Sequence, residues 1–221
     1  MKGVVTRRTG ARAERDKGMS LIELLVAMGI FTFVIAIFMS GVVAMTRNTS
    51  QAQAVSDATT AARKALDQFD RQVRDSTAIN RPGAGVTGAY YVEYLVPSLA
   101  AVGTPVCHQW RYDPIARTLD TRSWADSATP TPSGWSTVAT DVRNDLSTPD
   151  PPFVFTMAGT PSVRQQLTVT LDIGPAQRAG AQVSATYAAR NTSAATTTQN
   201  DISPVDGQSD TPVCQAGVGR P

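Results

Sequence analysis

The sequence predicts an α+β protein in which one long N-terminal helix packs on an antiparallel β-sheet. Three observations predict this class. A basic leader precedes 22 residues without a charge, positions 24–45. A helical apolar period continues beyond them to position 73, and no proline interrupts positions 20–81. After Pro82 the apolar period changes to two, the spacing of a strand with one buried face.

The leader, residues 1–18, carries the positive charge of the chain. It holds six basic and two acidic residues, whereas the remainder holds 14 basic and 16 acidic residues. The formal net charge of +2 therefore conceals a mildly acidic body. Without the leader no basic patch of the kind that binds nucleic acid remains, so no direct nucleic-acid partner is expected.

Residues 24–45 are long enough to span a membrane as a helix. At about 1.5 Å per residue they cover roughly 30 Å, the thickness of a bilayer core. Basic residues before a span stay in the cytoplasm, so the chain after Arg47 is expected outside it. The two cysteines, Cys107 and Cys214, then lie in an oxidising compartment, and we expect a disulfide between them.

Neither an ordinary secretory signal nor a plain anchor explains this segment fully. An ordinary cleaved signal has an apolar region of about 7–15 residues, which is shorter. A plain anchor fits the length but leaves Glu23 unexplained, because a carboxylate within a span costs a few kcal/mol and usually has a partner. The alternative for Glu23 is an interfacial position from which the carboxylate reaches water.

Residues 18–25 read GMSLIELL, and with the basic leader before them they resemble the type III signal of type IV pilins and pseudopilins. The resemblance implies that a prepilin peptidase cuts between Gly18 and Met19 and methylates the new amine of Met19. It implies a partner for Glu23, the N-terminal amine of a neighbouring subunit during assembly. A desolvated carboxylate is tolerated when it meets an opposite charge. The family usually has phenylalanine where this chain has Met19.

The apolar run 25–31 is similar to that of minor pilins and of J-, I- or W-type pseudopilins. Beyond it, apolar residues at helical spacing mark one face of an amphipathic helix, expected to pack on the sheet: Val55, Ala58, Ala62, Leu66, Phe69 and Val73. Strands are expected at 89–96, 106–112, 117–123, 166–173 and 182–189, where β-branched and aromatic residues alternate between turn residues. The type IV pilin fold has the same plan, a long helix on an antiparallel sheet.

The expected organisation follows in chain order. Residues 1–18 are a cleaved leader, 19–46 the transmembrane half of the helix, and 47–81 its amphipathic half. Residues 82–190 form a β-rich globular domain. Residues 191–221 are expected to be a largely disordered tail, because Ser, Thr, Ala, Gln and Gly dominate there.

Other motifs predict no chemistry. The glycines of residues 83–88 match a dinucleotide-binding pattern but lack a preceding strand and a following helix, and are interpreted as a flexible connection. His108 is the one histidine, and with two distant cysteines it gives no zinc spacing. The acids Asp141, Asp145 and Asp150 lack the spacing of a calcium loop. We therefore expect no metal, no cofactor and no enzymatic activity.

The function expected from these observations is that of a minor pilin or pseudopilin. Such a chain is a structural subunit of a type IV pilus, processed by prepilin peptidase and assembled with other pilins through its N-terminal helix into an envelope-spanning filament. Before assembly it would be a single-pass protein of the cytoplasmic membrane, in contact with lipid. One alternative is a pseudopilin of a type II secretion system or DNA-uptake filament. An alternative of another class is a membrane-anchored β-rich binding protein or enzyme.

Overall fold

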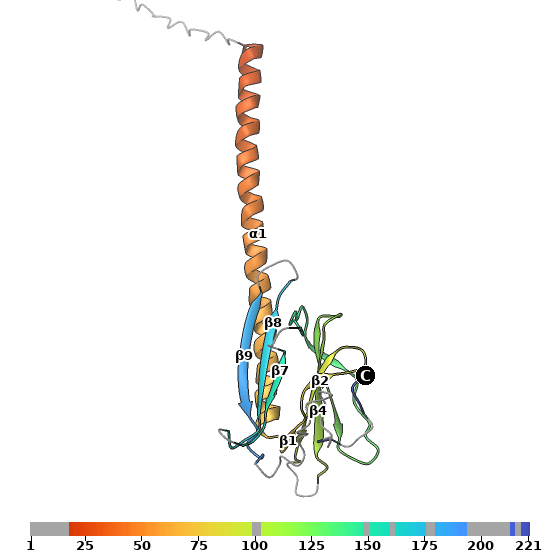
Figure 1. Cartoon of the computed structure of the whole chain (residues 1–221). Coiled ribbons are helices and arrows are strands. Elements are labelled where there is room, and N and C mark those ends of the chain that lie inside the picture. Colours follow the sequence, from red (N-terminus) through yellow and green to blue (C-terminus); the bar gives the residue numbers. More distant parts are fainter. Residues whose placement is uncertain are drawn as a thin grey trace, which may run out of the picture. The chain divides into compact units, whose positions relative to one another are not determined.

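The computed structural model describes residues 18–98, 103–147, 151–159, 162–175, 180–193, 213–214 and 218–221. The chain forms two compact units, Met1–Asn48 and Thr49–Pro221. Helix α1 (Leu21–Arg74, 54 residues) runs from the first unit into the second (Figure 1).

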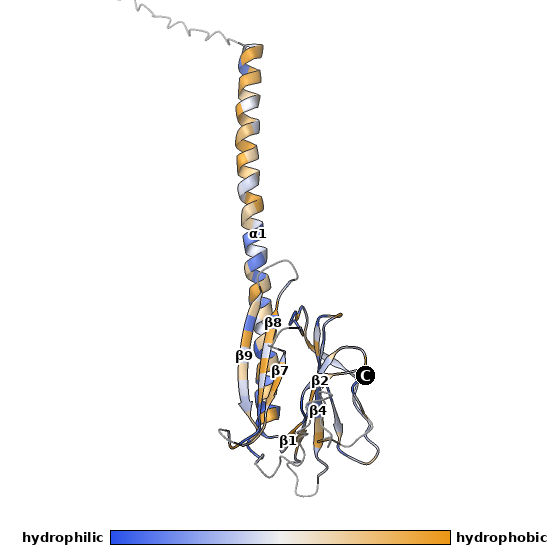
Figure 2. Cartoon of the chain, viewed as in Figure 1, coloured by the Kyte–Doolittle hydropathy of each residue, from blue (hydrophilic) through white to orange (hydrophobic). Residues whose placement is uncertain are grey.

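The first half of α1 is mostly apolar, and its uncharged stretch follows Glu23 in the first turn (Figure 2). All side chains from residue 21 to residue 50 are exposed. The hydroxyls within this stretch donate to carbonyls one turn back: Thr32 to Met28, Ser40 to Ile37 and Thr46 to Val42. A helix with internally satisfied polar groups and an apolar surface suits a lipid environment. By length and composition it can cross a membrane.

Two antiparallel sheets follow α1. The first has the strand order β1-β3-β4-β5-β6, with β2 also paired to β3, and the second has the order β7-β8-β9. The strands are β1 (Ala78–Ile79), β2 (Gly83–Ala84), β3 (Tyr90–Val96), β4 (Val106–Asp113), β5 (Thr118–Ala125), β6 (Ser136–Ala139), β7 (Phe153–Thr156), β8 (Gln166–Ile173) and β9 (Ala181–Ala188).

The structure places strands at all five expected segments, β3, β4, β5, β8 and β9, with ends that differ by at most two residues. The expected single sheet is instead two sheets, and four short strands, β1, β2, β6 and β7, were not predicted. Helix α1 ends at Arg74, not at residue 81. The chain turns there because Ser76 donates its hydroxyl and its amide to the carbonyl of Val73, and β1 then pairs with β3.

The predicted apolar face of α1 is the side of the helix that packs in the domain. Its residues Ala58, Ala62, Phe69 and Val73 are buried, together with Ala65. They meet inward-facing side chains of both sheets, among them Val92, Tyr94, Trp110, Tyr112, Leu119, Phe153, Leu167, Val169, Leu171 and Ile173. The ring of Phe69 stacks on that of Trp110 with 4.0 Å between centroids. The helix thus supplies one layer of a core that both sheets share.

Polar side chains also fix α1 on this core. The side-chain oxygen of Gln72 accepts hydrogen bonds from the hydroxyl of Tyr94 and the indole nitrogen of Trp110. The hydroxyl of Tyr187 donates to the carbonyl of Leu66 over 3.0 Å. Burial raises the pKa of Tyr94 well above its ordinary value and that of Tyr187 to about 12, so both phenols stay protonated donors.

Candidate processing and assembly site

The start of α1 is set by Ser20. Residues 18–20 are exposed and lie outside the helix. The carbonyl of Ser20 accepts from the amides of Glu23 (3.0 Å) and Leu24 (3.1 Å), and its hydroxyl accepts from the amide of Glu23 at 3.3 Å. This is an N-cap, in which a serine side chain satisfies an amide that the first helical turn leaves unpaired. The bond between Gly18 and Met19 therefore lies outside the helix, in exposed backbone.

Gly18 has no structural reason to be glycine within the described chain. A Cβ built there would meet no heavy atom within 4 Å, and the backbone is outside the left-handed region that favours glycine. A requirement for a small residue at this position would have to come from a partner. That is the requirement expected of a peptidase that cuts after residue 18.

Glu23 lies in the first turn of α1 and is exposed. Its charge is favourable there because the helix dipole is positive at the N-terminus. Among the residues that the structure describes, no cation pairs with it. The carboxylate is thus accessible, next to an apolar helix surface, to a positive group from outside the chain.

A comparison with protein families gives this region a class. Residues 15–39 match the family model described as the prokaryotic N-terminal methylation motif. This match supports a type IV pilin-like family with a prepilin leader for the N-terminal region of the chain. Its long N-terminal helix and antiparallel sheets are an α+β arrangement consistent with the type IV pilin fold. Neither a curated protein nor a solved structure matches the chain.

The motif implies processing by a prepilin peptidase and assembly with pilin-like subunits, and the apolar helix indicates membrane anchoring. The roles expected for Gly18, Met19 and Glu23 remain predictions. The geometry places all three within one exposed stretch at the start of α1.

The structure joins Cys107 on β4 to Cys214 by a disulfide, with 6.0 Å between the Cα atoms. That spacing is typical of disulfides. Strand register aligns Leu95, Cys107 and Trp124 in one row across β3, β4 and β5. Val213 packs with this row, so the disulfide lies in a second, small apolar cluster.

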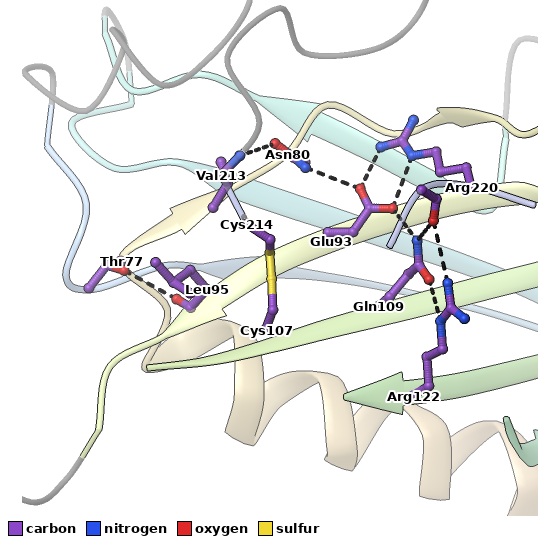
Figure 3. Close-up of a disulfide and its surroundings, with 11 residues drawn as sticks. Thr77, Asn80, Glu93, Leu95, Cys107, Gln109, Arg122, Val213, Cys214 and Arg220 are labelled. Carbon is purple, nitrogen blue, oxygen red and sulfur yellow. Dashed lines mark hydrogen bonds and ion pairs between the residues drawn. A yellow bond between two sulfur atoms is a disulfide. The ribbon is translucent and has the colours of Figure 1, made fainter. Parts of the chain in front are cut away.

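The expectation of a largely disordered tail mostly concerns residues outside the described ones. The tail residues that are described lie against the sheet, at the expected partner of Cys107 and beyond it. Val213 and Cys214 are buried, and Arg220 forms an ion pair with Glu93 whose side chains are 9% and 6% exposed. Figure 3 shows these tail residues against the sheet face that carries Cys107 and Glu93. A disulfide and an ion pair, rather than many apolar side chains, hold these residues.

The glycines of residues 83–88 form a tight hairpin, not a flexible connection. β2 pairs with β3, and Gly88 has a positive φ of 82° in the turn between them. A Cβ at Gly85 would lie 2.6 Å from the ring of Tyr91 and 2.8 Å from the carbonyl oxygen of Arg220. Glycine is needed at position 85 because the tail passes directly over it.

The remaining polar candidates have local roles. His108 lies half-buried on β4 against the ring of Tyr94, 5.7 Å between centroids, and burial lowers its pKa. Asp141 lies 3.7 Å from Arg117, and Asp145 accepts two hydrogen bonds from Ser147, which lower the pKa of that carboxyl. Asp150 lies outside the described residues. Within the described ranges, no group of three or more His, Cys, Asp or Glu side chains could hold a metal ion.

Sequence reasoning missed Glu93 and Arg220 as a pair. One signal was present: an acid within an aromatic strand, Tyr-Val-Glu-Tyr, needs a buried partner if the strand is covered on both faces. Nothing in the sequence identified that partner, which lies 127 residues further along the chain.

Proposed function

We propose that this protein is a minor pilin, a structural subunit of a type IV pilus with no catalytic activity of its own. The observation that carries the proposal is the methylation motif at residues 15–39, on a leader whose Gly18–Met19 bond lies exposed outside α1. Prepilin peptidase removes residues 1–18. The domain that begins near Thr49 lies outside the cytoplasm, and the subunit then leaves the membrane for the filament.

In this proposal Glu23 guides the subunit into the filament. Its accessible carboxylate pairs with the N-terminal amine of a neighbouring subunit as the apolar helices pack together. This ion pair compensates the free-energy cost of holding the Glu23 carboxylate away from water. The same processing and the same helix would serve a pseudopilin of a secretion or DNA-uptake filament, and copurification with the assembly machinery of one system distinguishes these forms.

Processing is tested by mass spectrometry of the protein extracted from membranes of cells that contain the peptidase. We expect the mature chain to begin at Met19. The variant Gly18→Glu should retain the leader, because a long charged side chain does not fit where a small residue is required. Gly10→Glu, the same change eight residues upstream, is the matched control and should be cleaved. An intact wild-type leader, or a cut after the apolar stretch, would refute the proposal.

Assembly is tested separately with Glu23→Gln. Glutamine keeps the shape and the N-terminal helix position but removes the charge. We expect normal cleavage and loss of incorporation into sheared filaments, measured by immunoblot. Asp57→Asn removes another exposed acid from the same helix and should assemble. Equal incorporation of Glu23→Gln and wild type would leave Glu23 with the interfacial role only.

A further inference from the structure

On the outer face of the first sheet, the side chain of Arg220 is 9% exposed and lies among polar groups of the sheet. Arg220 donates to both carboxylate oxygens of Glu93, from Nε to Oε1 at 3.0 Å and from Nη2 to Oε2 at 2.6 Å. Nη2 also donates to the carbonyl of Arg81 at 2.7 Å. The two-pronged geometry is specific for the planar guanidinium fork, which an ammonium group cannot reproduce.

The pocket is fixed by side chains other than its occupant. Gln109 donates to Glu93 Oε1 at 2.8 Å and Asn80 donates to Oε2 at 3.3 Å (Figure 3). Arg122 donates its Nε to the side-chain oxygen of Gln109 at 2.7 Å, which sets the orientation of that amide. Glu93, Gln109 and Arg122 face one another across β3, β4 and β5. The Glu93 carboxylate is therefore oriented to accept hydrogen bonds from a guanidinium group.

The same region is coupled to the disulfide. Cys214 lies six residues before Arg220, and its half-cystine partner Cys107 is in the row of residues next to Glu93 and Gln109. Asn80 links the residues beside the disulfide to the pocket. Its side chain accepts from the amide of Val213 at 2.9 Å and donates to Glu93. A covalent anchor at short range raises the effective concentration of Arg220 at the pocket.

We propose that Glu93, Gln109 and the carbonyl of Arg81 form a guanidinium-binding pocket, which Arg220 fills as an internal ligand and which the Cys107–Cys214 disulfide keeps filled. Residues 213–214 and 218–221 then act as a strap over the outer face of the sheet. Without the disulfide, as in a variant that lacks both cysteines, the strap is no longer held at the sheet and Arg220 leaves the pocket more often.

Chemical rescue tests the pocket in the detergent-solubilised full-length protein. Arg220→Ala leaves Glu93 buried without its cation and should lower the melting temperature by roughly 5–20 °C. Millimolar ethylguanidinium should restore part of this loss with a saturable dependence on concentration, and ethylammonium should not. Arg63→Ala, an exposed helix position, should need no rescue. Equal effects of the two cations, no recovery, or recovery that persists in Arg220→Ala with Glu93→Gln would overturn the pocket.

A second variant distinguishes a guanidinium-specific site from a general folding defect. Arg220→Lys keeps the positive charge but cannot donate as a fork, so its melting temperature should fall below that of wild type. Wild-type stability of Arg220→Lys would show that charge alone suffices and would refute a guanidinium-specific site.

Amide hydrogen exchange tests the role of the disulfide. The amide of Val86 donates to the carbonyl of Arg220, whereas the amide of Gly85 donates to Ala89 within the hairpin. In Cys107→Ser with Cys214→Ser, Val86 should lose its protection while Gly85 keeps it. Unchanged protection of Val86 would mean that the strap closes without the disulfide. These outcomes do not depend on processing or assembly, so the inference can fail while the proposed function stands.

Discussion

Charged side chains on the outer face of the first sheet are buried only where several partners meet them. Asp120, with a side chain 3% exposed, accepts from two nitrogens of Arg111 and from the hydroxyls of Thr118 and Thr137. Trp135 lies 4.3 Å from the guanidinium carbon of Arg111. Removing one member of such a group would leave a buried charge uncompensated, which costs more than the pair contributes. Each residue is therefore fixed by its neighbours.

His108 makes the stability of the domain depend on pH. Burial lowers its pKa from the ordinary value of 6.5, so the folded domain favours the neutral ring. Its contribution is fully present above the unfolded pKa, near 6.5, and is lost as pH falls from there toward the lower folded pKa. We expect the melting temperature of wild type to fall between pH 7.5 and 5.5, and that of His108→Gln to fall less. The chain has no other histidine, so equal slopes would contradict this assignment.

At the level of helices and strands, the sequence predicted the elements that are long enough to show a repeating apolar pattern. The five strands of seven or eight residues are rich in β-branched and aromatic residues, with clear alternation in β8, and the apolar face of α1 showed helical spacing over five turns. β1 and β2 have two residues each, and β6 and β7 have four, too few to display a period. The division into two sheets could not be predicted either, because strand order depends on contacts between distant segments.

The candidate site followed the same rule. Gly18, Met19 and Glu23 lie within six consecutive residues, so a local motif identified them. The cysteine pair could be proposed because the chain has two cysteines. Glu93 and Arg220 could not be paired, because the chain has many acids and arginines and nothing in their local sequence selects one combination. The pairing of Glu93 with Arg220 can therefore be recognised only in the folded structure.

Phe69 tests how strongly side-chain packing holds α1 against the two sheets. It is fully buried and its ring lies 4.0 Å from Trp110 and 5.8 Å from Phe153, measured between centroids. Phe69→Ala should lower the free energy of unfolding by about 3–5 kcal/mol, through lost transfer energy and the cavity left behind. Arg63→Ala on the exposed face should change it by less than about 0.5 kcal/mol. Denaturant unfolding checks both, and similar values would mean that the buried face does not stabilise the domain.

At the scale of the whole molecule, burial divides the chain at the boundary between its two units. From residue 21 to residue 50 every side chain of α1 is exposed, whereas the buried helix residues begin at Ala58. The described residues of the first unit, 18–48, therefore form no core of their own, and their apolar surface needs lipid or other helices around it. The second unit has a continuous core and the disulfide. A membrane-anchored subunit that later packs by its helix requires this separation.

A fragment that begins at Thr49 should fold without the apolar half. It keeps Ala58 through Val73, both sheets and both cysteines, so no buried contact of the core is removed. Produced in an oxidising compartment, it should be soluble, show mixed helix and strand by circular dichroism and unfold cooperatively. Reduction should destabilise it by about 4–5 kcal/mol, the chain-entropy value for a closed loop of about a hundred residues. A fragment that begins at Leu66 is the matched comparison, because it lacks Ala58, Ala62 and Ala65 and should lose cooperative unfolding. If both fragments unfolded alike, the helix face would serve a partner and not the core of this domain.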